Sequence, residues 1–361
     1  SVYQVYVRVK VCDSSSSAGG VEANCVKYGS NYKPEGLLQQ NANKIRYGTF
    51  SFLNAGGIAQ QGGVMRAPMG FIGPTYPQPL STAVVTNTRG EWDATTGIMN
   101  TNPDAVSATA SGVAQSGVMN YLNKFGQSAK NYMMYDNVSE LYYAAVRYFE
   151  NLGNVPEWTN SVAAGVEGRE ARLDGFPAVT DWSGKDPISY SCQKNFILGI
   201  GDDHTHYDYN VGGSAVTSWR GNPATVAADS LNKADAWTKN LQTLEGFKAP
   251  TPWWKAGGSD ATYYIAGLAY GAHVNDLRPD LAGVQNISTY WMDVMEYQRA
   301  EDLNPYYLAA KYGGFSVPAG YDPANTTVPL AQEWWNTAGD SIDMNGNKRL
   351  RPDNYFLAGN A

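Results

Sequence analysis

The first part of the chain is patterned for short strands. Val2 to Val11 alternates Val and Tyr with Gln, Arg and Lys, which is the period of a half-buried strand. A second strand is expected over Ile45–Phe52, after a short helical segment that follows Pro34. The stretch from Thr82 to Met99 predicts an irregular hairpin, because two β-prone runs flank a polar turn.

Helices are expected in the middle of the chain, over Ser111–Phe125 and, more clearly, over Val138–Leu152. Asp136 or Asn137 can cap the second of these, and Gly153 follows its last apolar residue. Between its two ends, apolar residues recur at helical spacing.

Strands and helices alternate from Phe196 onward. The apolar run Phe196–Ile200 predicts a strand buried on both faces of a mostly parallel sheet. A helix is expected at Ala261–Ala272, a strand at Thr289–Met295 and a helix at Pro305–Tyr312. This alternation is typical of a doubly wound α/β sheet. Segments of weak periodicity, at about 153–190 and 211–252, are interpreted as long insertions between its core elements.

Composition excludes several classes of partner. The 361 residues include 26 Lys and Arg against 33 Asp and Glu, so the net charge is −7, without the clustered cations that bind nucleic acid. No window approaches 18 uninterrupted apolar residues, so no membrane span is expected. The chain has 38 Gly, 25 Tyr and 10 Trp with only 16% charged residues. This balance favours an extracytoplasmic protein.

The three cysteines support that location. Cys12 and Cys25 enclose a short loop rich in Ser and Gly, which a disulfide closes readily in an oxidising compartment. Cys192 comes just before an apolar strand, so it is expected to be a buried small hydrophobe rather than a reactive thiol.

The amino-acid sequences of several segments are much more specific than the alternation of strands and helices. They are CVKYGSNYKPEGLLQ, NKIRYGTFSFLN, GVMNYLNKFG, VSELYYAAVRYFENLGNVPEW, CQKNFILGIGDDHTH, YYIAGLAYGAHVNDLRPDL, YWMDVMEYQ, YLAAKYGGF and PDNYFLAGN. Together they closely resemble the PilY/PilC family of type IV pilus biogenesis and tip adhesin proteins. The order of strands and helices also resembles a von Willebrand factor A-like domain.

The resemblance implies both a fold and a function. It implies an α/β von Willebrand factor A-like domain over residues 1–361, with a doubly wound sheet, long loop insertions and a C-terminal extension at 316–361. The β-propeller that follows this region in the family is expected to be absent from the chain. The implied function is pilus assembly and adhesion at the pilus tip, outside the cell, after export through the periplasm. Implied partners are minor pilins and the rest of the tip complex, the C-terminal propeller of the parent chain, and a host or abiotic surface.

A-type domains also imply a divalent-cation site, Mg²⁺ or Ca²⁺, with oxygen ligands from three loops at the carboxyl edge of the sheet. The family pattern is Asp-x-Ser-x-Ser after the first strand, a Thr before a helix and an Asp after a later strand. Asp202 matches the last position, and Asp136 or Ser139 lies where the second loop falls, although Thr is absent there. Residues 13–17 spell Asp-x-Ser-x-Ser, but we interpret this as a coincidence, with the motif-bearing strand expected upstream of Ser1.

A second candidate metal site is the loop with His204, His206 and Asp208. Their alternate spacing puts them on one side of an extended segment, and imidazole with carboxylate suits Zn²⁺. The alternative is a polar loop at a strand end whose side chains cap neighbouring elements.

A third candidate is a calcium loop formed by Asp343, Asn345 and Asn347 with Asp353. It is similar to the pattern Asp-x-Asn-x-Asp-Gly, but the Gly comes two places early and cations occupy three positions between 348 and 351. Since those cations repel Ca²⁺, a degenerate turn is the favoured interpretation.

Catalysis is not expected. The chain has no Gly-x-Ser-x-Gly elbow, phosphate loop or dinucleotide fingerprint, and it has only three histidines. Two other classes stay open beside the pilus module. One is a metal-dependent enzyme that uses His204, His206 and Asp208, and the other is a structural subunit of an extracellular filament.

Overall fold

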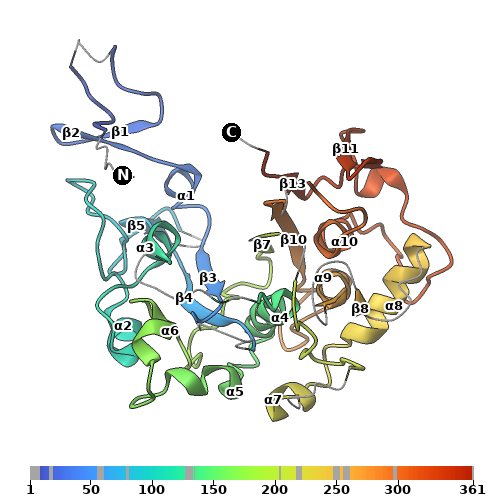
Figure 1. The fold of residues 1–361 in the computed structure, drawn as a ribbon. Helices are drawn as coiled ribbons and strands as arrows, with labels where there is room; N and C mark the ends of the chain where they lie inside the picture. Colours follow the sequence, from blue (N-terminus) through green and yellow to red (C-terminus); the bar gives the residue numbers. More distant parts are fainter. Residues whose placement is uncertain are drawn as a thin grey trace, which may run out of the picture. The chain divides into compact units, whose positions relative to one another are not determined.

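The chain divides into two compact units in the computed structural model (Figure 1). The first contains residues 1–49, 66–128 and 175–179, and the second contains residues 50–65, 129–174 and 180–361. The sequence is interpreted above as a single domain with insertions and does not predict this division. The structure describes residues 9–15, 19–54, 61–78, 81–126, 133, 135–202, 205–216, 222–246, 253–254, 261–295 and 299–359. Most of the strand expected at Val2–Val11 lies outside these residues.

Short elements make up the first unit, and β3 and β4 include residues of both units. Antiparallel pairs are formed by β1 with β2 and by β5 with β6, and β3 pairs with β4. The elements are β1 (Cys25–Tyr28), β2 (Asn31–Pro34), α1 (Leu37–Gln40), β3 (Tyr47–Ser51), β4 (Val64–Gly70), β5 (Thr75–Pro77), β6 (Val84–Thr86), α2 (Ala105–Ser111) and α3 (Val118–Lys124).

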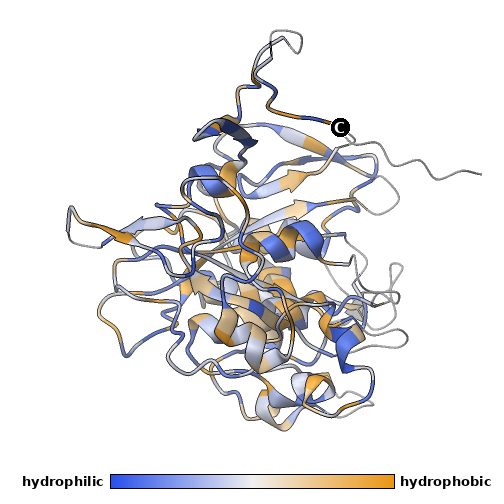
Figure 2. Cartoon of the chain, turned by 90° about the vertical axis from the view of Figure 1, so that its left-hand side faces the viewer, coloured by the Kyte–Doolittle hydropathy of each residue, from blue (hydrophilic) through white to orange (hydrophobic). Residues whose placement is uncertain are grey.

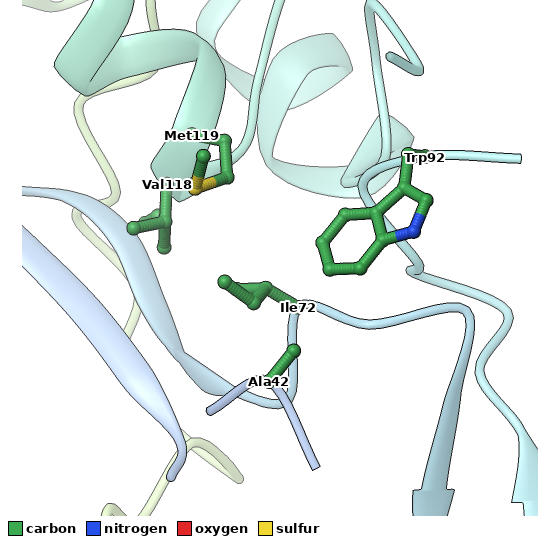
Figure 3. Packing of buried hydrophobic residues seen from close by; sticks show 6 residues of the cluster. Ala42, Ile72, Trp92, Val118 and Met119 are labelled. Carbon is green, nitrogen blue, oxygen red and sulfur yellow. The ribbon is translucent and has the colours of Figure 1, made fainter. Parts of the chain in front are cut away.

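A small apolar core holds the first unit together. Trp92 and Ile72 face the first turn of α3, and hydrophobic residues are spread over the helices and strands (Figures 2 and 3). The carboxylate of the buried Glu91 accepts hydrogen bonds of 2.6 Å from the backbone N–H groups of Val118 and Met119. Glu91 therefore satisfies two donors at the start of α3 that have no partner inside the helix. Burial raises the pKa of Glu91 to about 7.

Cys12 and Cys25 are joined by a disulfide, as expected from the sequence, with their Cα atoms 5.7 Å apart. The backbone N–H of the buried Cys12 donates to Glu22 Oε2 at 2.9 Å. Cys192 differs from its expectation. It is a free, exposed thiol, because it lies in the polar turn before the strand and outside the core.

Replacing Cys12 and Cys25 together by Ser should lower the free energy of unfolding by about 3 kcal/mol, because the bond closes a short loop in the unfolded chain. Urea titrations under oxidising conditions measure this loss. Cys192→Ser is the matched control, and it should leave the urea midpoint unchanged. Equal midpoints for the wild type and the double variant would contradict the prediction.

The second unit contains a parallel sheet, several helices and a C-terminal hairpin (Figure 1). Its elements are α4 (Val138–Phe149), α5 (Pro156–Thr159), the 3-10 helix η2 (Asn160–Val162), α6 (Arg169–Leu173), β7 (Asn195–Gly201), α7 (Ala224–Ala227), α8 (Ala234–Glu245), β8 (Trp253–Trp254), β9 (Ala261–Thr262), α9 (Tyr264–Val274), β10 (Ile287–Asp293), α10 (Pro305–Tyr312), the 3-10 helix η4 (Gln332–Trp334), β11 (Ser341–Met344), β12 (Asn347–Leu350) and β13 (Tyr355–Leu357).

Three parallel strands in the order β13-β10-β7 form the sheet. Helices α9 and α10 contact β10, and α4 contacts α9. The hydroxyl of Tyr142 in α4 is 2.7 Å from Thr289 Oγ1 in β10, and Tyr306 of α10 stacks on Trp291 of β10. All three helices therefore cover the face of the sheet that carries Thr289 and Trp291.

The opposite face of β7 is exposed, which corrects the expectation of a strand buried on both faces. Phe196, Leu198 and Ile200 are all exposed, whereas the alternate residues of the strand are less accessible. The run is uniformly apolar in sequence, so its pattern gives no sign that only one of its faces is covered. The described residues thus contain a parallel α/β sheet with helices on one face, and the von Willebrand factor A-like assignment stays a prediction.

Other elements follow the sequence to different degrees. Helix α10 has the predicted bounds, and α4 ends at Phe149 rather than at Leu152. Helix α8 lies within the stretch 211–252, which is interpreted from its weak periodicity as an insertion between core elements. It packs against α9, so this segment contributes to the core.

Candidate functional site

Acidic side chains gather where β7 and β10 end. Asp202 directly follows β7 and Asp293 is the last residue of β10. The nearby Tyr306 is fully buried. Its pKa is raised well above the ordinary value by burial and by the negative charges of Asp136, Asp208, Asp202 and Asp293. Three of the aspartates predicted as metal ligands, at positions 136, 202 and 208, therefore do share one neighbourhood, at the carboxyl edge of the sheet.

Several hydrogen bonds hold the segment 205–210 against the start of α4. His206 Nδ1 is 2.9 Å from Asp136 Oδ1, in a pair that is partly exposed. Asn137 Nδ2 donates to the carbonyl oxygen of Tyr207 at 3.0 Å, and the Thr205 hydroxyl donates to the carbonyl oxygen of Asp136 at 2.7 Å. These bonds hold the polar loop against the helix, as in the capping alternative considered for this loop.

Ser139 and Asp208 form the buried part of the site. Ser139 Oγ donates to Asp208 Oδ2 at 2.5 Å and accepts from the backbone N–H of Ile265 at 3.0 Å. The backbone N–H of Thr262 donates to Asp208 Oδ1 at 2.7 Å. Burial raises the pKa of Asp208 to about 6. Both side chains thus join α4 to the start of α9.

Glu140 is a central residue of the site that the sequence analysis missed. Its carboxylate is fully buried and accepts from the N–H of Gly62 at 2.6 Å and from the N–H and Nδ2 of Asn210 at 3.1 and 2.7 Å. Burial is the main cause that raises its pKa to about 8. The missed signal was its place beside Ser139 in the first turn of a helix that is otherwise rich in apolar residues.

Among the described residues, the predicted His and Asp ligands do not form a group of three that could hold one ion. Among them, one group of three His, Cys, Asp or Glu has its ligand atoms within 4.8 Å of one another, namely Cys12, Glu22 and Cys25, and the disulfide occupies both sulfurs. His206 and Asp208 bond to different partners, and His204 lies outside the described residues. Since Mg²⁺, Ca²⁺ and Zn²⁺ need several converging ligands, the metal sites expected from the sequence stay predictions.

The predicted calcium loop forms a β-hairpin. Strands β11 and β12 pair antiparallel, and Asn347 is the first residue of β12. Asn345 and Gly346 have φ angles of 52° and 84°, which is typical of a two-residue type I′ turn with the sequence Asn-Gly. Asp343 Oδ1 accepts from the N–H of Gly346 at 2.9 Å. The interpretation as a degenerate turn matches this geometry.

Asp353 has another partner than the hairpin. Its carboxylate accepts from the backbone N–H and the hydroxyl of Thr337, at distances between 2.8 and 3.1 Å.

The ring of Trp335 is buried, and its centroid lies 4.0 Å from the Nζ of Lys311. This tryptophan therefore packs in the interior and does not serve as a contact surface.

A comparison with known proteins found a relative of this chain. The type IV pilus biogenesis factor PilY1 homolog of Xylella fastidiosa (strain Temecula1 / ATCC 700964) is 43% identical over 395 residues, an alignment that covers 100% of this chain and 31% of the relative. The chain is similar to a PilY1-type protein. It spans just under a third of this relative's length, and no family model and no solved structure matches it. In the part of the chain that the structure describes, no helix is long and apolar enough to cross a membrane.

Proposed function

We propose that this chain is a module of a type IV pilus biogenesis factor and acts by binding other proteins and surfaces at the pilus tip. The observation that carries the proposal is the 43% identity to a named pilus biogenesis factor along the whole chain. The disulfide of Cys12 and Cys25 supports a protein that folds in an oxidising compartment such as the periplasm. Minor pilins are the proposed docking partners, and a host or abiotic surface is the proposed outward contact.

Binding without chemical turnover is favoured by the site itself. Its buried side chains, Ser139, Asp208 and Glu140, are held by internal hydrogen bonds that fix neighbouring segments. The hydroxyl of Ser139 is buried and bonded on two sides, to the carboxylate of Asp208 and to the backbone N–H of Ile265, so it is not exposed to a substrate. The proposed role of these residues is therefore to stabilise the module.

Deletion of the gene in its own organism tests the function. We expect the loss of surface pili, restored by the wild-type gene, and we expect the chain in sheared pilus fractions together with minor pilins by mass spectrometry. Immunogold labelling of intact pili should place it at their ends. Normal piliation after deletion, or a chain recovered only as a homopolymer, would overturn the proposal, and the second result would favour a structural filament subunit.

A metal-dependent enzyme is the other candidate, and metal content separates it from the pilus module. The purified protein, dialysed against buffer with zinc, should hold no stoichiometric Zn²⁺, because His206 pairs with Asp136 while Asp208 is buried against Ser139. Mass spectrometry with inductively coupled plasma measures the content. One zinc per chain, lost in His206→Gln, would favour the enzyme instead.

A further inference from the structure

A carboxylate lies beside the disulfide of the first unit. Glu22 Oε2 accepts the backbone N–H of Cys12 at 2.9 Å and lies 3.5 Å from Sγ of Cys25. A carboxylate oxygen of Glu22 and the two sulfurs all lie within 4.8 Å of one another. The two sulfurs are bonded to each other, so neither has a hydrogen to donate to this carboxylate. A backbone N–H, and not a thiol, therefore holds the negative charge of Glu22 next to the S–S bond.

The two cysteines differ in their exposure to solvent. Cys12 is buried, with 6% of its surface exposed, whereas Cys25 is partly exposed. Thiol–disulfide exchange begins when a thiolate attacks one sulfur of the bond and expels the other, and its rate depends on access to the attacked sulfur. Cys25 is therefore the expected point of attack, and Cys12 is the expected leaving group.

Glu22 is the charge closest to this point of attack for which the structure gives a contact. The residue is exposed, and it forms no ion pair with another described residue. Lys10 and Asp13, on the other side of Cys12, pair with each other at 2.9 Å, so their charges largely cancel. Lys27 lies on β1 two residues after Cys25, about 7 Å away along the strand. An anion that approaches Cys25 is therefore repelled mainly by Glu22.

We propose that Cys25 is the site of thiol–disulfide exchange in this protein, and that Glu22 makes it react more slowly with anionic thiols than with neutral or cationic ones. The incoming thiolate forms a bond to Cys25 Sγ, the S–S bond breaks, and its electron pair leaves with Cys12 Sγ, which takes a proton from water. A second thiolate then attacks the sulfur of the bound reagent, forms the reagent's own disulfide and releases Cys25 as a thiol.

The same route in reverse forms the bond. A disulfide-donating protein would then be joined to Cys25 first, and Cys12 would displace it. This inference does not depend on a role in pili.

Reduction by three small thiols of different charge tests the proposal. In a Cys192→Ser background, which removes the exposed native thiol, the oxidised protein is mixed at low ionic strength with cysteamine, 2-mercaptoethanol or 3-mercaptopropionate. Cysteamine and 3-mercaptopropionate differ by two charges, which act through water over roughly 7 Å and correspond to about a fivefold change in relative rate. Glu22→Gln should therefore lower the ratio of the cysteamine rate to the 3-mercaptopropionate rate by about fivefold.

Two comparisons separate charge from structure. Glutamine keeps an oxygen that can accept the N–H of Cys12, so Glu22→Gln removes the charge and leaves an acceptor in place. Glu167→Gln, at an exposed carboxylate of the second unit, is the matched control and should leave the ratio unchanged. In 1 M salt the effect of Glu22→Gln on the ratio should shrink, because such salt screens charges beyond about 3 Å.

Mapping the intermediate assigns the sulfur that is attacked. After quenching with acid and N-ethylmaleimide, tandem mass spectrometry of the tryptic peptide 11–27 should find the small thiol on Cys25 and the maleimide on Cys12. A small thiol found mainly on Cys12 would overturn the proposal. An unchanged rate ratio in Glu22→Gln would also overturn it, and so would equal acceleration of all three reagents, since a loosened loop rather than a lost charge would then explain the faster reaction.

Discussion

Gly199→Val should destabilise the second unit by about 3 kcal/mol or more, because the sheet has no room for a side chain at this position. A Cβ atom at Gly199 would lie 1.9 Å from the ring of Trp291, its neighbour on β10. That ring is stacked on Tyr306 with a centroid distance of 4.1 Å, and Tyr306 is fully buried. The indole therefore cannot move aside without disturbing α10. Urea unfolding followed by near-ultraviolet circular dichroism measures the loss.

Two further variants make this result specific to the contact. Gly70→Ala, in β4, is the matched control, because a Cβ there meets nothing within 4 Å, and we expect little change. Trp291→Leu removes the opposing ring, so Gly199→Ala should cost less in that background than in the wild type. Equal costs in both backgrounds would show that strand propensity rather than the clash with Trp291 determines the effect.

The sequence predicts where helices and strands begin and end better than it predicts what packs against them. Local signals set the bounds of α10, where Pro305 occupies the first turn, Asn304 caps it and Gly313 follows it. The same signals cannot tell which faces of β7 are covered, because coverage depends on elements distant in sequence. Helix α8 was missed for a related reason: its pattern is weak, and its packing against α9 provides much of its stability.

The candidate site shows the same limit at the level of single residues. The sequence assigns Asp136 and Ser139 to one candidate metal site and Asp208 to another. It does not reveal that Ser139 and Asp208 satisfy each other, because this requires the position of the backbone N–H groups of Thr262 and Ile265. Helix α4 is buried on nearly all sides. Its acidic Glu140 is fully buried while its apolar Leu141 is partly accessible, which is the reverse of what their polarity predicts.

Glu140→Gln should flatten the dependence of stability on pH between about 5 and 8. The buried carboxyl has a pKa of about 8, against an ordinary value of 4.5. The folded state therefore binds this proton more tightly than the unfolded state does, and the free energy of unfolding falls as the pH rises through that window. The contribution of one such group is at most about 1.4 kcal/mol per pH unit. Glutamine resembles the protonated form and does not titrate.

The slope of stability against pH, rather than its level, decides this prediction, because the amide also changes the hydrogen bonds to Gly62 and Asn210. Burial also raises the pKa of Glu150 to about 8 and that of Glu91 to about 7, so part of the slope should survive in Glu140→Gln. Glu167→Gln, at an exposed carboxylate, is the control and should keep the full wild-type slope. Urea midpoints at several pH values measure the slopes. A Glu140→Gln slope equal to that of the wild type would mean that this carboxylate is charged in the folded protein throughout the window, and that its three hydrogen-bond donors offset its burial.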